Sequence, residues 1–194
     1  MIKTTLKLAA PYLAVLVFWL FFRNAWLTIL AYHAQILFWT RASFKELFKG
    51  FNVQGFLIFA VPCLSTGFIA YFLLPFMYPE AALASWYSDY KLEDFALILM
   101  LPYFGFIHPP LEQLHWAPLR QDLGMTAHLC FAGYHAFVLS GLLYNTWLVF
   151  SLLILITVSI LWTYLYKCYR GLTIPALTHV FADTGIITAA YFLI

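Results

Sequence analysis

The sequence predicts an all-α integral membrane protein, a single domain over residues 1–194 built as a polytopic bundle of about seven transmembrane helices. The chain is 64% hydrophobic and only 9% charged, whereas a soluble domain carries roughly 25% charged residues. Its apolar runs, such as 148–162, are apolar all round rather than alternating. Because only closed barrels and helices satisfy every backbone polar group in lipid, and barrel strands alternate, these runs favour helices.

Seven segments approach the length of about 20 apolar residues that a membrane-spanning helix needs. The first is expected to remain as an uncleaved span, because bulky Phe21, Phe22 and Arg23 follow it where a removable signal would carry small residues. In chain order the expected spans lie near 7–22, 25–40, 53–75, 94–111, 125–145, 147–166 and 172–193.

The basic residues predict an orientation for these spans. With the N-terminus inside, the outer loops hold only Arg23 and Lys91, and the bias of Lys and Arg toward the inner side agrees with the positive-inside rule. We therefore expect a cytoplasmic N-terminus and an external C-terminus. The inner loops then hold Lys3, Lys7, Arg41, Lys45, Lys49, Arg120, Lys167 and Arg170.

Composition also removes several classes of function. The formal net charge of +2 and the lack of a basic run argue against a nucleic-acid partner. The cysteines Cys63, Cys130 and Cys168 form no CxxC pair, so they predict neither a zinc cluster nor a disulfide framework.

Charged and titratable residues at membrane depth are few, and such residues usually mark function. We expect the isolated His33 and His108 to be hydrogen-bonding struts between helices, whereas a carboxylate at depth, such as Glu112, seldom serves packing. The remaining candidates fall in three pairs, which are Glu112 with His115, His128 with His135, and His179 with Asp183.

Helical spacing gathers these residues. His179 and Asp183 are four residues apart and share a helix face, as do His128, Phe131 and His135. Counted from the inner ends of their helices at about 1.5 Å per residue, Glu112, His135 and His179 all lie roughly 12–17 Å deep. Three helices thus bring titratable groups to one level, which favours one shared pocket toward the inner half. Trp116 shares the face of Glu112 and His115.

This set of residues is suited to hydrolysis without a metal. Glu112 would take a proton from water, and His135 would hold that water or relay its proton. His179 and Asp183 would act on the side of the oxyanion. The same four residues could instead ligate Zn²⁺, and composition alone leaves both chemistries open. We expect no metal and no cofactor.

These residues also carry a resemblance to a known family. The chain resembles the CAAX-protease and bacteriocin-processing (CPBP, or Abi) family of glutamic-type intramembrane endopeptidases, whose motifs are EExxxR, FxxxH and HxxxN or HxxxD. Here 112-EQLHWA-117, 131-FAGYH-135 and 179-HVFAD-183 stand in that order, inside a family-like core of about residues 94–193. The resemblance implies that Glu112 is the catalytic carboxylate, His135 its water-holding partner, and His179 with Asp183 the oxyanion-side pair.

The first motif departs from the family at two positions. Gln113 replaces the second Glu, and Ala117 replaces the Arg, for which Arg120 is a possible substitute three residues later. The surviving positions favour an active enzyme acting on a membrane-anchored protein or peptide within the lipid bilayer. Small bacterial members of this kind resemble sorting-type proteases, which cut proteins that carry a short C-terminal motif, an apolar helix and a basic tail. This resemblance implies that the protein lies in the bacterial inner membrane.

Two other classes of function compete with this one. The departures at Gln113 and Ala117 would suit a non-catalytic relative that binds or chaperones membrane segments. Membrane histidines on different helices could also hold haem, although this hypothesis leaves Glu112 and Asp183 without a role.

Overall fold

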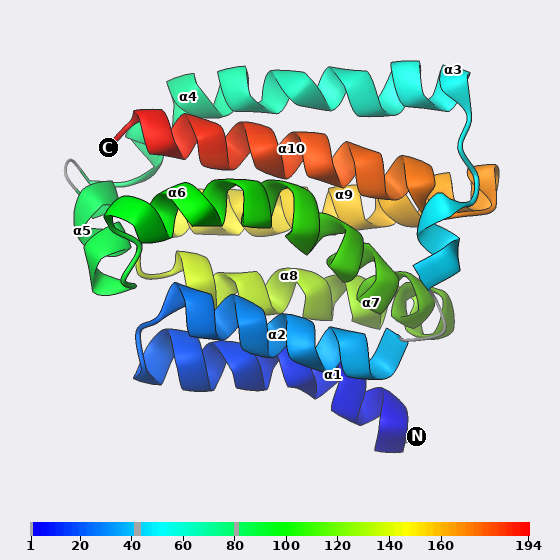
Figure 1. Ribbon diagram of the computed structural model, residues 1–194, viewed down its shortest axis with the longest axis horizontal. Coiled ribbons are helices and arrows are strands. Elements are labelled where there is room, and N and C mark those ends of the chain that lie inside the picture. The colour runs from blue at the N-terminus through cyan, green and yellow to red at the C-terminus, as the bar shows by residue number, and fades with distance from the viewer. Residues whose placement is uncertain (1, 41–43, 80–81) are drawn as a thin grey trace.

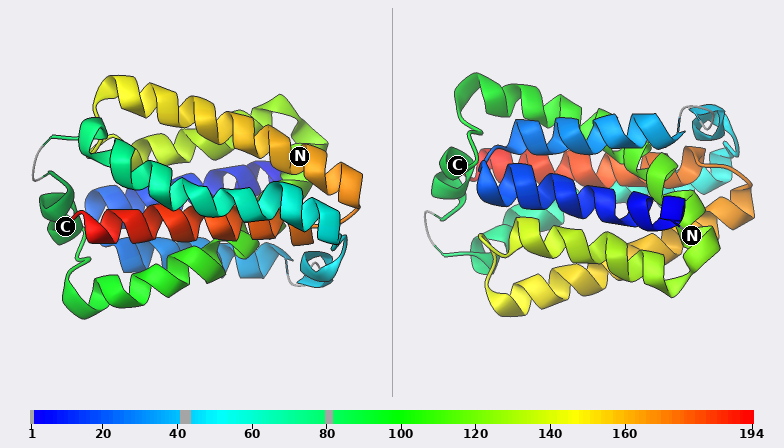
Figure 2. Two further views of the ribbon diagram at one scale, coloured as in Figure 1. Left: turned by 90° about the horizontal axis from the view of Figure 1, so that it is seen from above. Right: turned by 90° about the horizontal axis from the view of Figure 1, so that it is seen from below.

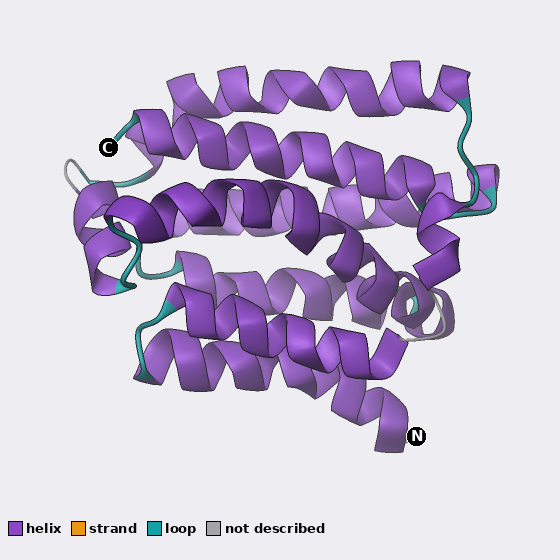
Figure 3. Cartoon of the chain, in the orientation of Figure 1, coloured by secondary structure: helices purple, strands orange, loops and turns teal. Residues whose placement is uncertain are grey.

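The computed structural model describes residues 2–40, 44–79 and 82–194, and every regular element in these ranges is a helix (Figure 3). The expected Arg41 in an inner loop lies outside the described residues. The helices run along one long axis, with the N-terminus at one end of the bundle and the C-terminus at the other (Figure 1). The predicted all-helical fold class is confirmed.

The first half of the chain forms two helices on one side and a third long helix on the other. A short helical turn, η2 (Phe44–Phe48), and α5 (Ala82–Asp89) lie in connections between the long helices. The long helices are α1 (Ile2–Ala14) continued by η1 (Val15–Phe21), α2 (Ala25–Thr40), and the run α3 (Val53–Gly55), η3 (Phe56–Ala60), η4 (Val61–Leu64) and α4 (Ser65–Met77).

The second half supplies the helices that hold most of the candidate residues. The first of them is one continuous run that bends midway, between its α6 and α7 portions (Figure 1). In order they are α6 (Asp94–Pro102) with η5 (Tyr103–Ile107) and α7 (His108–Leu123), then α8 (Met125–Leu139), α9 (Asn145–Tyr169) and α10 (Thr173–Phe192).

Wide π-helical turns occur near prolines in long helices of both halves of the chain. Pro11 precedes η1, Pro62 follows η3, and Pro102 directly precedes η5. Proline has no N–H to donate to the preceding turn, so each of these helices lacks a hydrogen bond close to its π-helical turn. The turn η5 is the one that matters for the site, because it sets the direction in which α7 presents its buried face.

Helix α10 occupies the centre of the bundle. It contacts α4, η5, α7 and α9, and Figure 2 shows α9 on one side of it and α6 on the other. Its crossing with α4 is close because Gly67 and Gly185 meet, and a Cβ on Gly185 would lie 2.6 Å from the Gly67 nitrogen. Small residues at a crossing let two membrane helices approach backbone to backbone.

The structure does not show the seven spans that the sequence predicts, although long helices occupy all seven expected positions. By length and composition, four helices of the described residues could cross a membrane, which are Lys3–Phe21, Val53–Met77, Asp94–Leu123 and Asn145–Tyr169. The others fall short for physical reasons. Helices α2 and α8 have 16 and 15 residues, and α10 carries His179, Asp183 and four threonines that lower its hydropathy.

Candidate functional site

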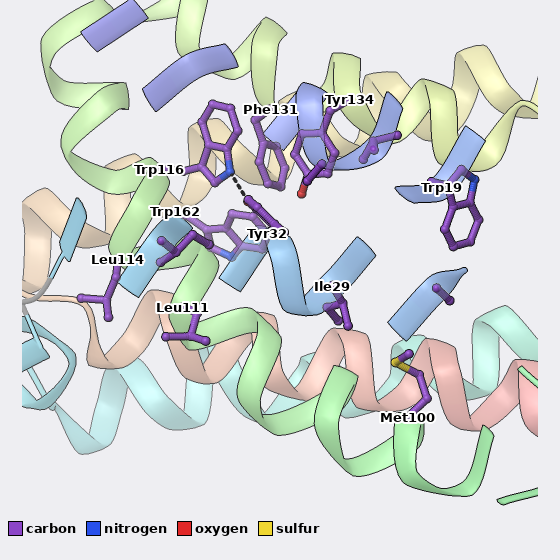
Figure 4. Close-up of a cluster of buried hydrophobic side chains, with 14 of the residues drawn as sticks. Trp19, Ile29, Tyr32, Met100, Leu111, Leu114, Trp116, Phe131, Tyr134 and Trp162 are labelled. Carbon is purple, nitrogen blue, oxygen red and sulfur yellow. Dashed lines mark hydrogen bonds between the residues drawn. The ribbon is translucent and has the colours of Figure 1, made fainter. Parts of the chain in front are cut away.

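The centre of the candidate site is Glu112, on the buried face of α7, where only 1% of the residue is exposed. Its oxygen Oε1 accepts hydrogen bonds from the hydroxyls of Tyr32 on α2, at 2.7 Å, and of Tyr134 on α8. Trp116 Nε1 donates in turn to the Tyr32 hydroxyl at 2.8 Å. Figure 4 shows Tyr32, Trp116 and Tyr134 together with Phe131 in the same aromatic core.

The second carboxylate oxygen, Oε2, has a different environment. It lies 3.6 Å from His108 Nε2 and 3.7 Å from His179 Nε2, distances beyond those of a hydrogen bond. In the described part of the chain this oxygen has no hydrogen-bond partner. Glu112 therefore presents one saturated oxygen and one oxygen that is free to accept a proton.

His179 and Asp183 form the pair that their spacing predicts. His179 Nε2 lies 3.2 Å from Asp183 Oδ2 on the same face of α10. The imidazole stacks on the Trp162 ring of α9, with centroids 4.1 Å apart, and Trp162 Nε1 donates to Thr178 at 3.0 Å. This stacking fixes the plane of the ring, so that Nε2 faces both carboxylates.

Gln113 and Arg120 lie behind His179. Arg120, only 3% exposed, donates from Nη2 to Gln113 Oε1 at 2.5 Å, and Gln113 Nε2 lies 3.1 Å from His179 Nδ1. Arg120 thus reaches the position where the family motif has its second Glu, although it stands three residues beyond the motif's Arg. The guanidinium also lies over the Trp162 ring, 5.6 Å from its centroid.

His128 joins the same group through a serine. His128 Nδ1 lies 2.8 Å from Ser159 Oγ, and this oxygen accepts a hydrogen bond from Arg120 Nη1 at 3.2 Å. Ser159 is fully buried on α9. His128 therefore belongs to the support behind His179 and makes no direct contact with Glu112 among the hydrogen bonds and ion pairs of the described residues.

His135 is one aromatic ring away from Glu112. Its imidazole stacks on Tyr134 with centroids 4.0 Å apart, and Phe131 lies edge-on to it at 4.9 Å. His135 Nδ1 donates to the Phe131 carbonyl at 2.8 Å, which places the proton of the neutral ring on Nδ1 and leaves Nε2 as an acceptor. Its half-buried position makes it more accessible than Glu112.

His115 packs among the aromatic side chains beside the site. It is buried and lies edge-on to Trp116 and Tyr32, with centroids 5.2 Å and 6.2 Å away. Its neighbour Trp116 is completely buried and supports Tyr32, as described above.

His33 and His108 form the interhelical strut that the sequence predicts, and they also reach the site. His33 Nδ1 lies 2.8 Å from the Tyr103 hydroxyl, and His33 Nε2 lies 3.0 Å from His108 Nδ1. These contacts tie α2 to η5 and α7. Because His108 is four residues before Glu112 and shares its helix face, the strut ends beside the carboxylate.

Several residues of this site escaped the sequence analysis, among them Trp162 and Ser159 on α9. So did the two tyrosines that donate to Glu112, Tyr32 and Tyr134, each of which precedes a histidine that the sequence did single out. Tyrosine is so common in this chain, with 13 copies, that neither position stood out. The signal that identifies them is a Tyr-His pair of adjacent residues in the middle of an apolar helix.

Neither a metal-binding cluster nor a similar protein assigns a role to these residues. Within residues 2–40, 44–79 and 82–194, no group of three or more His, Cys, Asp or Glu side chains has an arrangement that could hold a metal ion. Comparisons of the chain with models of protein families, with curated proteins and with solved structures find no match.

Proposed function

We propose that this protein is an intramembrane endopeptidase of the glutamic type, in which Glu112 activates water for attack on a peptide bond. The observation that carries the proposal is the unequal carboxylate of Glu112. Two tyrosines donate to Oε1, while Oε2 has no hydrogen-bond donor among the described residues and faces the imidazoles of His108 and His179. A carboxylate that is positioned in this way can take a proton on one defined oxygen.

The reaction follows from the groups around that oxygen. Glu112 Oε2 removes a proton from water as the water oxygen bonds to the scissile carbonyl carbon. The negative charge that develops on the carbonyl oxygen competes with Asp183 for the Nε2–H of His179, because a donor aimed at developing charge stabilises the transition state. Glu112 then passes its proton to the amide nitrogen, and the C–N bond breaks. His135, with Nε2 as an acceptor, holds the attacking water or relays its proton to Glu112.

The proposal includes a membrane topology and a substrate class. We take α2, α8 and α10 to cross the bilayer beside the four longer apolar helices, which gives seven spans with the N-terminus inside and the C-terminus outside the bacterial inner membrane. The substrate would be a membrane-anchored protein or peptide, cut in or near its anchoring segment, as in the processing of a C-terminal sorting signal.

The experiment compares host cells that carry wild-type protein with cells that carry Glu112→Gln. Mass spectrometry of protein termini in membrane and secreted fractions should reveal cleaved termini only with wild type, because Gln cannot take the proton. Thr157→Ala, on the exposed part of α9, is a control that should leave the termini unchanged. Equal termini from wild type and Glu112→Gln, at equal protein abundance, would rule out the protease.

A second candidate is a non-catalytic binder or chaperone of membrane segments. It is favoured by the loss of the Glu–Arg pair of the first motif, since Gln113 carries no charge to match Arg120. If the protein is such a binder, cells with wild-type protein and cells with Glu112→Gln should show the same protein termini, and Glu112→Gln should keep the physiological function. The same comparison therefore separates the two functions.

A further inference from the structure

Arg120 is the centre of two hydrogen-bonded chains that run in opposite directions. One arm passes from Nη2 to Gln113 Oε1, and the other from Nη1 to Ser159 Oγ. Both contacts are buried, and Arg120 has no ion-pair partner among the described residues. A guanidinium has five N–H donors and no acceptor, so each neighbour must offer it an oxygen. The arginine therefore determines the direction of the Gln113 arm, because an amide oxygen can only accept, whereas the Ser159 hydroxyl can accept from Arg120 and still either donate to His128 or accept from it.

This direction determines the proton positions on the Gln113 arm. Because Oε1 accepts from Arg120, the amide NH₂ of Gln113 is the group that faces His179 Nδ1, at 3.1 Å. An amide nitrogen only donates, so Nδ1 must be the unprotonated nitrogen of the ring. The proton of neutral His179 is then on Nε2, which lies 3.2 Å from Asp183 Oδ2 and 3.7 Å from Glu112 Oε2.

We infer that Gln113, oriented by Arg120, is a positioning residue that holds His179 as the neutral tautomer protonated on Nε2. This inference deepens the proposed function and rests on it for its chemical meaning, because a donor is needed where the oxyanion forms. The proton arrangement itself follows from the contacts alone.

The inference gives a physical account of Gln113, the departure from the family motif. A carboxylate at this position would accept from Arg120 and also from His179 Nδ1–H, so it would place a proton on Nδ1. The amide does the opposite, since it accepts on one side and donates on the other. The same arrangement makes Nε2 of His179 a poor metal ligand. A metal-bound histidine donates its other ring N–H to an acceptor, whereas Nδ1 of His179 faces the NH₂ donor of Gln113.

Nitrogen NMR of the purified full-length protein in lipid nanodiscs tests the inference directly. The protein would carry ¹⁵N-labelled histidine, and the ring signals of His179 would be identified by their loss in His179→Gln. A proton-bearing Nε2 and an unprotonated Nδ1 at neutral pH are expected. A protonated Nδ1 in the wild-type protein would overturn the inference, whatever the protein cleaves.

Gln113→Glu supplies the complementary test. This variant has nearly the same shape, and we expect it to move the whole His179 population to a state with a proton on Nδ1. The matched control is Ser159→Ala, which breaks the other arm of Arg120 and should leave His179 as in wild type. An unprotonated Nδ1 in Gln113→Glu would show that Gln113 does not determine the tautomer.

The two proposals fail separately. Retained cleavage by Glu112→Gln would contradict the proposed protease function, and the ring signals of His179 would still be as predicted here. A proton on Nδ1 of His179 would contradict the proposed role of Gln113, and cleavage could still depend on Glu112.

Discussion

Glu112 has two oxygens with different surroundings, and the difference comes from residues far apart in the sequence. Tyr32 is 80 positions before it and Tyr134 is 22 positions after it, yet both hydroxyls reach Oε1. The Tyr32 hydroxyl makes two hydrogen bonds, because it donates to Glu112 and its oxygen also accepts from Trp116 Nε1. A buried N–H that loses its acceptor costs more than the net value of one hydrogen bond.

Tyr32→Phe should therefore destabilise the protein by about 1–3 kcal/mol, because it leaves the Trp116 N–H buried without an acceptor. Adding Trp116→Phe to Tyr32→Phe should cost less than Trp116→Phe does in the wild-type protein, since residues in one hydrogen-bonded network are coupled. Thermal unfolding in detergent of the two single variants and the double variant measures this coupling. Simple additivity would contradict the predicted link between Tyr32 and Trp116.

At the scale of the helices, prolines and glycines position the site. Pro102 and the turn η5 alter the path of the helix between Asp94 and Leu123, so that the His108 and Glu112 face of α7 turns toward α2 and α10. On its opposite side α10 packs against α4, where Gly67 and Gly185 allow close contact. Thr66 strengthens this crossing by donating to the Ala182 carbonyl at 3.1 Å.

Gly185→Ala should lower stability by about 1–3 kcal/mol, because the new Cβ would meet the Gly67 backbone and force the two helices apart. The matched control is Gly141→Ala, whose Cβ would make only ordinary contacts, the nearest at 3.8 Å to the Tyr90 hydroxyl. Unfolding midpoints of both variants in the same detergent give the comparison. Equal midpoints would mean that the α4–α10 crossing tolerates a wider separation.

At the scale of the whole molecule, the helices are aligned along one axis, and basic residues gather toward one end of it. The short helix η2, which carries Lys45, and the C-terminal end of α9, which carries Lys167, lie at the end of the bundle that holds the N-terminus, while α5 and the C-terminus lie at the other end (Figure 1). Helix α2, at about 24 Å from its 16 residues, is shorter than a hydrocarbon core of roughly 30 Å. It nevertheless runs from one end of the bundle toward the other.

Labelling of single cysteines distinguishes seven spans from four. Seven spans place Ser88 of α5 and Cys168 of α9 on opposite sides of the membrane, whereas the four longest apolar helices alone would place them on the same side. In a background with Cys63→Ala and Cys130→Ala, we expect an impermeant maleimide to label Cys168 only after permeabilisation. With Cys168 also replaced, Ser88→Cys should be labelled in intact spheroplasts. Labelling of both from one side would contradict seven spans.

The sequence by itself determined the helical fold class and the positions of the long helices, because apolar runs and their interruptions are local properties. It also singled out Glu112, His179 and Asp183, since charge at membrane depth is conspicuous in a chain with so few charged residues. The i, i+4 spacing of His179 and Asp183 correctly placed both on one face.

Only the tertiary structure decided how these groups are connected. The hydroxyls of Tyr32 and Tyr134, the arginine that reaches Gln113, and the strut from His33 to His108 all join different helices or different turns. Such contacts depend on how α2, α7, α8 and α10 are rotated and spaced. That geometry is determined by packing around prolines and small residues, which no local pattern of the sequence records.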